Sequence, residues 1–213
     1  MGVPKKILCF GDSNTWGYNP ENKSRFPNSI RWTGRLQTRL EPEYQIIEEG
    51  VNGRTTLHSD PLEAYPCGKE DLIPSLKSHS PIDIVILLLG TNDLKVQFDL
   101  SAHDIAQGVR TLARMIQTSD YGVNHGATTL FLLAPPPLGK LTELRDRFEG
   151  GSEKSLALAL HYAEVANELD CPFINLGDHI QSSDRDGIHW EADAHRIVAK
   201  TLEEKLREST ERL

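Results

Sequence analysis

Ile84-Val85-Ile86-Leu87-Leu88-Leu89 is the stretch that decides the fold, because it is apolar at every position and shows no polar alternation. Residues 130–134 form a second unbroken apolar run. Strands have this pattern when both of their faces are covered, as in a parallel sheet between two layers of helices. The two runs therefore predict a parallel sheet with helices on both sides.

Apolar runs and helix-length segments alternate along the chain. The expected strands span 6–10, 44–48, 83–89, 128–134 and 172–176, and the expected helices span 30–40, 101–118, 153–169 and 191–207. Such alternation is typical of an α/β sandwich with a mostly parallel sheet. Because the sequence shows no repeat, linker or low-complexity segment, we expect a single domain over 1–213.

The composition of the chain argues against several kinds of binding partner and indicates the cellular compartment. The net charge of −8, without a basic run, argues against nucleic acid or an anionic membrane as a partner. Cys9, Cys67 and Cys171 are sparse and lack a Cys-x-x-Cys spacing, which argues against a disulfide framework and a zinc site. The apolar runs are too short for a signal peptide or a membrane span. We therefore expect a cytoplasmic protein, with Cys9 as a buried, reduced thiol.

Two connections are candidates for loops that cover a substrate. Residues 57–75 are the least regular part of the sequence, and residues 135–150 form another long connection. Loops of this kind often carry binding residues on a rigid scaffold. Whether they cover their own site or a site on a neighbouring subunit stays open.

Three polar blocks follow predicted strands: Gly11-Asp12-Ser13-Asn14, Gly90-Thr91-Asn92-Asp93 and Asp186-Gly187-Ile188-His189. In open parallel sheets, ligands bind beyond the carboxyl ends of the strands. We therefore expect the three blocks to meet at one edge of the sheet.

The blocks contain the parts of a nucleophilic relay. Ser13 is the predicted nucleophile, and a serine hydroxyl needs a base within hydrogen-bond reach. His189 is the predicted base, and Asp186 can hold its imidazole through Nδ1 from the same turn. Gly11 would let the chain turn sharply off the strand, and the short side chain of Asp12 would pin that turn. Taken alone, Ser13 could instead be only a helix cap.

An oxyanion hole can be assembled from the same region. Its predicted donors are the backbone N–H groups of Ser13 and Gly53 and the side-chain amide of Asn92. Taken singly, Gly53 could be a turn residue and Asn92 a helix cap. A metal site is the weaker alternative, because no metal-ligand spacing recurs in the chain. Its ligands would be Asp186, His189, Asp193 and His195.

These blocks resemble the SGNH, or GDSL-type, hydrolase superfamily, whose signature residues correspond to Ser13, Gly53, Asn92 and His189, with the acid at Asp186. The resemblance implies a flavodoxin-like three-layer α/β/α sandwich with a five-stranded parallel sheet, and no cofactor or metal. The first block departs from the usual pattern, since it reads Gly-Asp-Ser-Asn rather than Gly-Asp-Ser-Leu. The second block lacks its usual early asparagine, with Glu48 or Glu49 in that region.

Further segments resemble the bacterial aryl esterase and acyltransferase branch, namely 31–34, 48–50, 54–56, 135–138 and 148–151. This resemblance implies a homo-oligomer and pocket walls at Asn14, Trp16, Thr91, Lys95, Phe148 and Ile188. Aromatic walls favour a small apolar acyl or aryl group. Trp16, Trp32 and Phe148 could equally be packing or subunit-interface residues.

The sequence therefore predicts a serine esterase. The resemblance implies that it hydrolyses short-chain, acetyl-like esters of small molecules and can also pass the acyl group to alcohols or peroxide. A carbohydrate O-acetyl esterase is the alternative, because it would share the relay and differ only in its acceptor pocket. A flavodoxin-like binding module without catalysis is a more remote alternative. The glycine patterns of phosphate and dinucleotide loops do not follow the first predicted strand.

Overall fold

Five parallel strands form the centre of the protein, in a computed structural model that describes residues 3–63 and 67–210. Their order in the sheet is β2-β1-β3-β4-β5, and each neighbouring pair is parallel. This order confirms the predicted parallel sheet. The strands are β1 (Lys5–Gly11), β2 (Tyr44–Gly50), β3 (Ile84–Leu88), β4 (Thr129–Ala134) and β5 (Phe173–Asn175).

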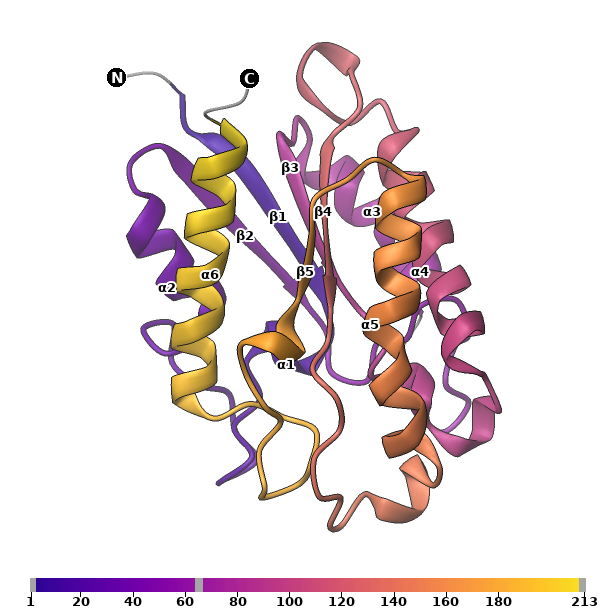
Figure 1. The fold of residues 1–213 in the computed structure, drawn as a ribbon. Coiled ribbons are helices and arrows are strands. Elements are labelled where there is room, and N and C mark those ends of the chain that lie inside the picture. The colour runs from indigo at the N-terminus through magenta and orange to yellow at the C-terminus, as the bar shows by residue number, and fades with distance from the viewer. Residues whose placement is uncertain (1–2, 64–66, 211–213) are drawn as a thin grey trace.

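Helices cover both faces of the sheet, which gives the expected three layers (Figure 1). One face carries α2 (Trp32–Leu40) and α6 (Ala192–Thr210). The other carries α3 (Gly68–His79), α4 (Ala102–Gln117) and α5 (Gly151–Glu168). None of the helices in residues 3–63 and 67–210 combines the length and the apolar character that crossing a membrane requires.

Each face of the sheet has its own apolar core, and β3 contributes to both. Val85 and Leu87 belong to the core beneath α4, whereas Ile86 and Leu88 belong to the core beneath α6. This two-sided burial explains why the β3 sequence has no polar alternation. Cys9 on β1 is likewise buried and unbridged, as expected.

Two elements differ from the sequence expectation. Helix α3 begins at Gly68, inside the 57–75 segment that we expected to be irregular. Its helical signal is weak because Pro74 stands within it, where a proline normally ends a helix. Residues 64–66 of that segment lie outside the described residues. Strand β5 is shorter than expected, because Leu176 already begins the turn η5 (Leu176–Asp178).

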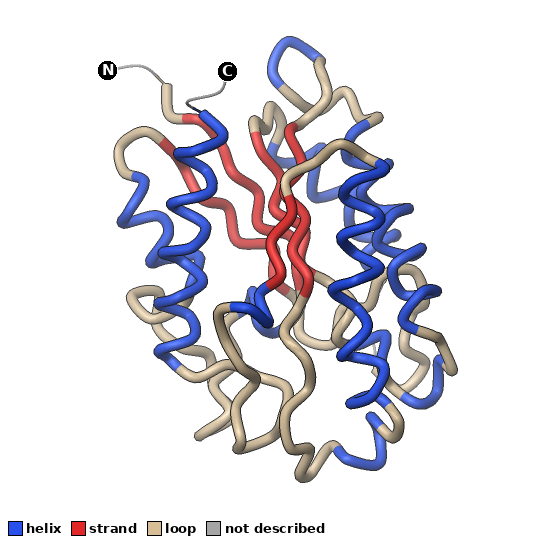
Figure 2. Tube along the Cα trace, viewed as in Figure 1, coloured by secondary structure: helices blue, strands red, loops and turns tan. Residues whose placement is uncertain are grey.

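The carboxyl ends of the central strands lie at one edge of the sheet. Gly11 is paired with Gly50 on one side and with Leu88 on the other. The loops that follow the strands therefore gather beyond this edge, in the lower part of Figure 2. They contain the short helices α1 (Ser13–Trp16), η1 (Asn92–Leu94), η2 (Val96–Phe98) and η4 (Arg145–Phe148), whereas η3 (Val123–His125) precedes β4.

Gly11 allows α1 to pack directly on the sheet. A Cβ atom at Gly11 would lie 2.1 Å from Thr15 Oγ1 and 2.8 Å from the Leu88 carbonyl oxygen. Gly11 is not among the residues with a positive φ, so its role is to leave space for α1 and not to supply a left-handed conformation. Asp12 caps α1, since its Oδ1 atom accepts a hydrogen bond from Asn14 N at 2.9 Å.

Asp12 is a buried ionisable group, and its titration should be visible in the stability of the protein. Burial raises the pKa of Asp12 from its ordinary value of 3.8 to about 6, against the opposing backbone hydrogen bond from Asn14. The native state therefore holds this proton more tightly than the unfolded chain does. The contribution of Asp12 to the free energy of unfolding is largest below about pH 4 and falls as the pH rises towards 6.

We predict that Asp12→Asn keeps the fold, because an amide oxygen can still accept from Asn14 N. Relative to the wild type, the variant should gain up to about 3 kcal/mol in the free energy of unfolding at pH 8. The gain should shrink as the pH falls from about 7 to about 4. Urea unfolding of both proteins across this range measures the difference, and a difference that is constant with pH would contradict the prediction.

Gly90, after β3, has a backbone conformation that favours glycine. Its φ angle is +117°, and a Cβ atom would lie 2.0 Å from the Tyr162 hydroxyl, which donates to the Leu89 carbonyl oxygen at 2.7 Å. We predict that Gly90→Ala lowers the free energy of unfolding by about 3 kcal/mol or more, through backbone strain and this collision.

The collision can be separated from the strain by adding Tyr162→Phe, which removes the colliding oxygen. Measured against Tyr162→Phe alone, Gly90→Ala should then cost clearly less than it does in the wild type. Urea unfolding of the two single variants and the double variant gives both costs. Equal costs in the two backgrounds would show that the Tyr162 hydroxyl does not contribute.

Candidate active site

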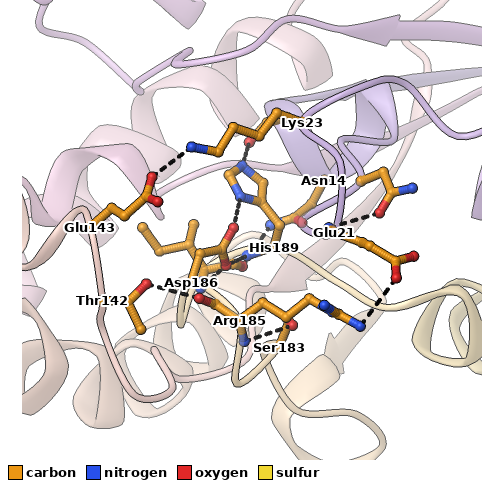
Figure 3. Close-up of polar contacts among 12 residues, drawn as sticks. Asn14, Glu21, Lys23, Thr142, Glu143, Ser183, Arg185, Asp186 and His189 are labelled. Atoms are coloured by element: carbon orange, nitrogen blue, oxygen red, sulfur yellow. Dashed lines mark hydrogen bonds and ion pairs between the residues drawn. The ribbon is translucent and has the colours of Figure 1, made fainter.

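Ser13, His189 and Asp186 form a chain of hydrogen bonds beyond the edge of the sheet. Ser13 is the first residue of α1, and the other two lie in the loop before α6. The Ser13 Oγ atom is 2.9 Å from Nε2 of His189. Nδ1 of His189 is 2.7 Å from Oδ2 of Asp186, and Figure 3 shows the carboxylate directed at the imidazole. The fold thus brings together residues that are 176 positions apart.

The local backbone holds Asp186 as an ionised acceptor. Its Oδ1 atom accepts hydrogen bonds from the N–H groups of Ile188 and His189, both at 2.9 Å. Burial alone would raise the pKa of Asp186, but the hydrogen bond and charge of His189 and these backbone donors hold it below its ordinary value. A carboxylate at Nδ1 fixes the proton on that nitrogen and leaves Nε2 to accept from Ser13.

Tyr18 packs against the imidazole of His189. The two ring centroids are 4.0 Å apart and the ring planes differ by 26°. Burial, and next the charge of Asp186, raise the pKa of Tyr18, so its hydroxyl stays neutral. The stack restricts rotation of the imidazole out of the line of hydrogen bonds. Near Tyr18, the exposed side chains of Lys23 and Glu143 form an ion pair at 2.7 Å (Figure 3).

The residues predicted to supply oxyanion donors line one cavity together with His189. They are Ser13, Gly53 and Asn92. Gly53 has a left-handed backbone with φ +77°, and a Cβ atom there would lie 2.2 Å from Glu63 Oε2. The Asn92 side-chain nitrogen donates to the carbonyl oxygen of Arg54 at 3.1 Å. Since an amide nitrogen carries two protons, the second is available to a ligand in the cavity.

The cavity beside Ser13 has a volume of about 180 Å³. Three of the predicted walls line it, namely Lys95, Phe148 and Ile188. The sequence did not predict the other lining residues as pocket walls, and most of them lie in loops. They are Tyr18, Asn52, Glu63, Leu144 and Arg147.

The other three predicted walls are not among the residues around this cavity. Asn14 is buried and donates to the Ile188 carbonyl oxygen at 3.4 Å, so it supports the loop of His189. Trp16 lies at the end of α1, with the guanidinium carbon of Arg25 5.1 Å from its ring centroid. Thr91 is buried in the turn that begins η1.

Lys95 belongs to a partly buried group of opposite charges. Its Nζ atom lies 2.7 Å from Asp60 and 3.0 Å from Glu63, and Arg147 contacts the same carboxylates at 3.2 and 2.8 Å. The Lys95 and Asp60 side chains are each only 2% exposed. Burial would raise the pKa of Asp60, but the hydrogen bond and charge of Lys95, the Leu62 N–H and the charge of Arg147 together hold that pKa below its ordinary value. This group joins three separate segments around the cavity.

These cavity residues gave little signal in the sequence. Tyr18 and Glu63 lie outside the strands and helices, and Arg147 lies in the short helix η4, so no periodicity in the sequence indicates which way these side chains point. Asp60 and Glu63 could have suggested partners for a buried lysine, but only the structure shows that Lys95 is buried.

The geometry of the four candidate metal ligands does not fit a metal site. His195 is buried within α6, and its Nδ1 atom accepts from Trp32 N at 3.3 Å. Burial lowers the pKa of His195 to about 3, so the ring stays neutral. Asp193 pairs with Arg196 at the surface. Within the described ranges, no three His, Cys, Asp or Glu side chains are grouped so that they could hold a metal ion.

The chain resembles known proteins in both sequence and structure. The chain is similar to the M. smegmatis aryl esterase, with 38% identity, a TM-score of 0.91, and coverage of 96% of this chain and 99% of that one. It is also similar to Est24, a carbohydrate acetylesterase from Sinorhizobium meliloti, with 37% identity, a TM-score of 0.91, and coverage of 95% and 98%. Among curated proteins, none matches.

The model of the GDSL-like lipase/acylhydrolase family matches residues 9–197. That range includes the whole sheet except the first residues of β1, and all three polar blocks. The chain therefore belongs to the GDSL-like lipase/acylhydrolase family and is a carboxylic ester hydrolase.

Proposed function

We propose that this protein hydrolyses short-chain carboxylic esters, with Ser13 as nucleophile, His189 as general base and Asp186 as the residue that orients the base. One observation carries the proposal. It is the continuous pair of contacts from Ser13 Oγ through His189 to Asp186, at 2.9 and 2.7 Å, beside a small cavity. The similarity to a protein described as an aryl esterase supports it.

In the proposed reaction, Ser13 Oγ forms a bond to the ester carbonyl carbon while Nε2 of His189 takes the hydroxyl proton. The carbonyl oxygen becomes an oxyanion, held by the N–H groups of Ser13 and Gly53 and by the Asn92 amide. The bond to the leaving alcohol then breaks, and His189 gives its proton to the alcohol oxygen. Water attacks the acyl-enzyme in the same way, which releases the acid and restores Ser13.

The size of the cavity supports a short acyl group. Its volume of about 180 Å³ is below the roughly 300–1,000 Å³ of pockets that hold drug-sized ligands. Leu144, Phe148 and Ile188 provide apolar surface, while Lys95 and Glu63 contribute a pair of opposite charges. An acetyl-sized group suits this space better than a long alkyl chain does.

A carbohydrate O-acetyl esterase is the second candidate. The similarity to Est24 supports it, and so do the polar side chains of Asn52, Glu63 and Arg147 around the cavity, which could hydrogen-bond sugar hydroxyls. The chemistry at Ser13 would be unchanged. The two candidates therefore differ in the alcohol that leaves and not in the acyl group that is transferred.

An alcohol or peroxide could replace water in the second step, because either can attack the same carbonyl carbon with His189 as base.

We also propose a homo-oligomer. Leu156 and Leu160, one turn apart on α5, are 70% and 64% exposed, and such apolar surface is typical of subunit contacts.

Replacement of Ser13 tests the nucleophile. Ser13→Ala should lower kcat for p-nitrophenyl acetate by at least about 10³-fold, because it removes the attacking oxygen. Asp186→Asn should lower kcat by about 10⁴-fold through the wrong imidazole tautomer. Ser75→Ala, at another buried serine on α3, is the control and should keep full activity. Equal turnover in the wild type and Ser13→Ala would exclude Ser13 as nucleophile.

A panel of esters tests the acyl group and the alcohol separately. From p-nitrophenyl acetate to the octanoate, kcat/KM should fall by at least about 100-fold, because the longer chain exceeds the cavity. Acetate release from phenyl acetate and from a peracetylated monosaccharide, at equal concentrations, compares the two candidates. A higher kcat/KM on the sugar would favour the carbohydrate esterase, and a flat chain-length profile would contradict the short-acyl proposal.

A further inference from the structure

Arg54 is a buried arginine that directly follows Gly53. Its side chain is only 2% exposed, and its guanidinium carbon lies 4.2 Å from the centroid of the Phe10 ring. It is not among the residues that line the cavity beside Ser13. Arg54 therefore does not contact a substrate bound in this cavity.

The guanidinium of Arg54 joins the carboxyl ends of β1 and β2. Nη1 donates to the carbonyl oxygen of Gly11 at 2.9 Å and to that of Glu49 at 2.5 Å. Nε and Nη2 both donate to Asp71 on α3, at 3.1 and 2.8 Å. Since the guanidinium is planar and its donor directions are fixed, this one group sets both strand ends relative to α3. Ser13 follows two residues after Gly11.

The backbone of the same residue holds the Asn92 side chain. The Arg54 carbonyl oxygen accepts from Asn92 Nδ2 at 3.1 Å. A carbonyl oxygen can only accept, so this contact decides which end of the amide faces Arg54. The Arg54 N–H donates to the Val51 carbonyl oxygen at 3.2 Å, which closes the turn that carries Gly53.

We propose that Arg54 is a positioning residue of the oxyanion hole, because its side chain and its carbonyl together fix the segments that carry Ser13, Gly53 and Asn92. The inference rests on the proposed roles of these three donors. Donors that are held in place act mainly on the charge that develops in the transition state. Misplaced donors should therefore lower kcat and leave KM nearly unchanged.

Arg54→Met tests the inference, since it keeps an unbranched side chain and removes the fork of donors. It should lower kcat for p-nitrophenyl acetate by about 10- to 100-fold and change KM by less than about threefold. Arg54→Lys keeps the charge without the fork, and its kcat should lie between those of Arg54→Met and the wild type.

Arg31→Met is the matched control for the loss of a buried arginine. Arg31 pairs with Glu48 at 2.6 Å, and neither residue lines the cavity. This variant should lose stability in urea unfolding and keep kcat within about threefold of the wild type. If Arg31→Met loses as much kcat as Arg54→Met, the effect is one of general destabilisation and the inference is overturned.

A double-mutant cycle with Asn92→Ala separates positioning from a structural role. Arg54→Met should lower kcat by a clearly smaller factor in the Asn92→Ala background than in the wild type, because the amide it helps to place is already gone. Additive losses would overturn the inference. If Arg54→Met does not fold, Arg54→Lys and Asp71→Asn take its place in the same cycle. An unchanged kcat in Asn92→Ala would instead refute the proposed oxyanion hole, which is a different failure.

Discussion

The parallel register of β1, β2 and β3 is the constraint on which the site depends. Because Gly11 lies opposite both Gly50 and Leu88, the segments that follow the three strands leave the sheet at one level. Close packing maintains that level, since a Cβ atom at Gly50 would lie 2.2 Å from the Trp16 backbone nitrogen. Short loops are then sufficient to bring Ser13 into the cavity, and α1 cannot drift away from the sheet.

The same edge concentrates buried charge, and the way each charge is compensated differs with its surroundings. Asp186 has an imidazole and two backbone donors, and its pKa is held below its ordinary value. Lys95 lies against Asp60. Asp12 has less compensation, and burial raises its pKa to about 6. Burying ions costs several kcal/mol each unless hydrogen bonds offset the loss of water. This edge of the sheet therefore holds polar groups in fixed positions at a cost in the free energy of unfolding.

Sequence reasoning reached the parts that topology alone determines. Ser13 and Asn92 follow buried strands directly, so the rule for parallel sheets is sufficient to predict that they meet. Sequence reasoning failed where helical geometry or loop conformation determines the direction of a side chain. Asn14 and Trp16 are close to Ser13 in the chain, but neither lines the cavity. Asn14 points about 100° away from Ser13 around α1 and donates to the Ile188 carbonyl oxygen, and Trp16 packs against Arg25. Tyr18 lies outside any periodic element, and no pattern predicts its stack on His189.

Asn92 shows why a motif specifies less than a site. The residue type supplies two amide protons, but the direction of the second proton depends on where the first is bound. That partner is the carbonyl oxygen of Arg54, a group that every residue type possesses. The guanidinium of Arg54, with its contacts to Gly11, Glu49 and Asp71, ties this carbonyl to the strand ends, together with the backbone hydrogen bond from Arg54 N to Val51. The orientation of the Asn92 amide therefore depends on a residue that does not itself line the cavity.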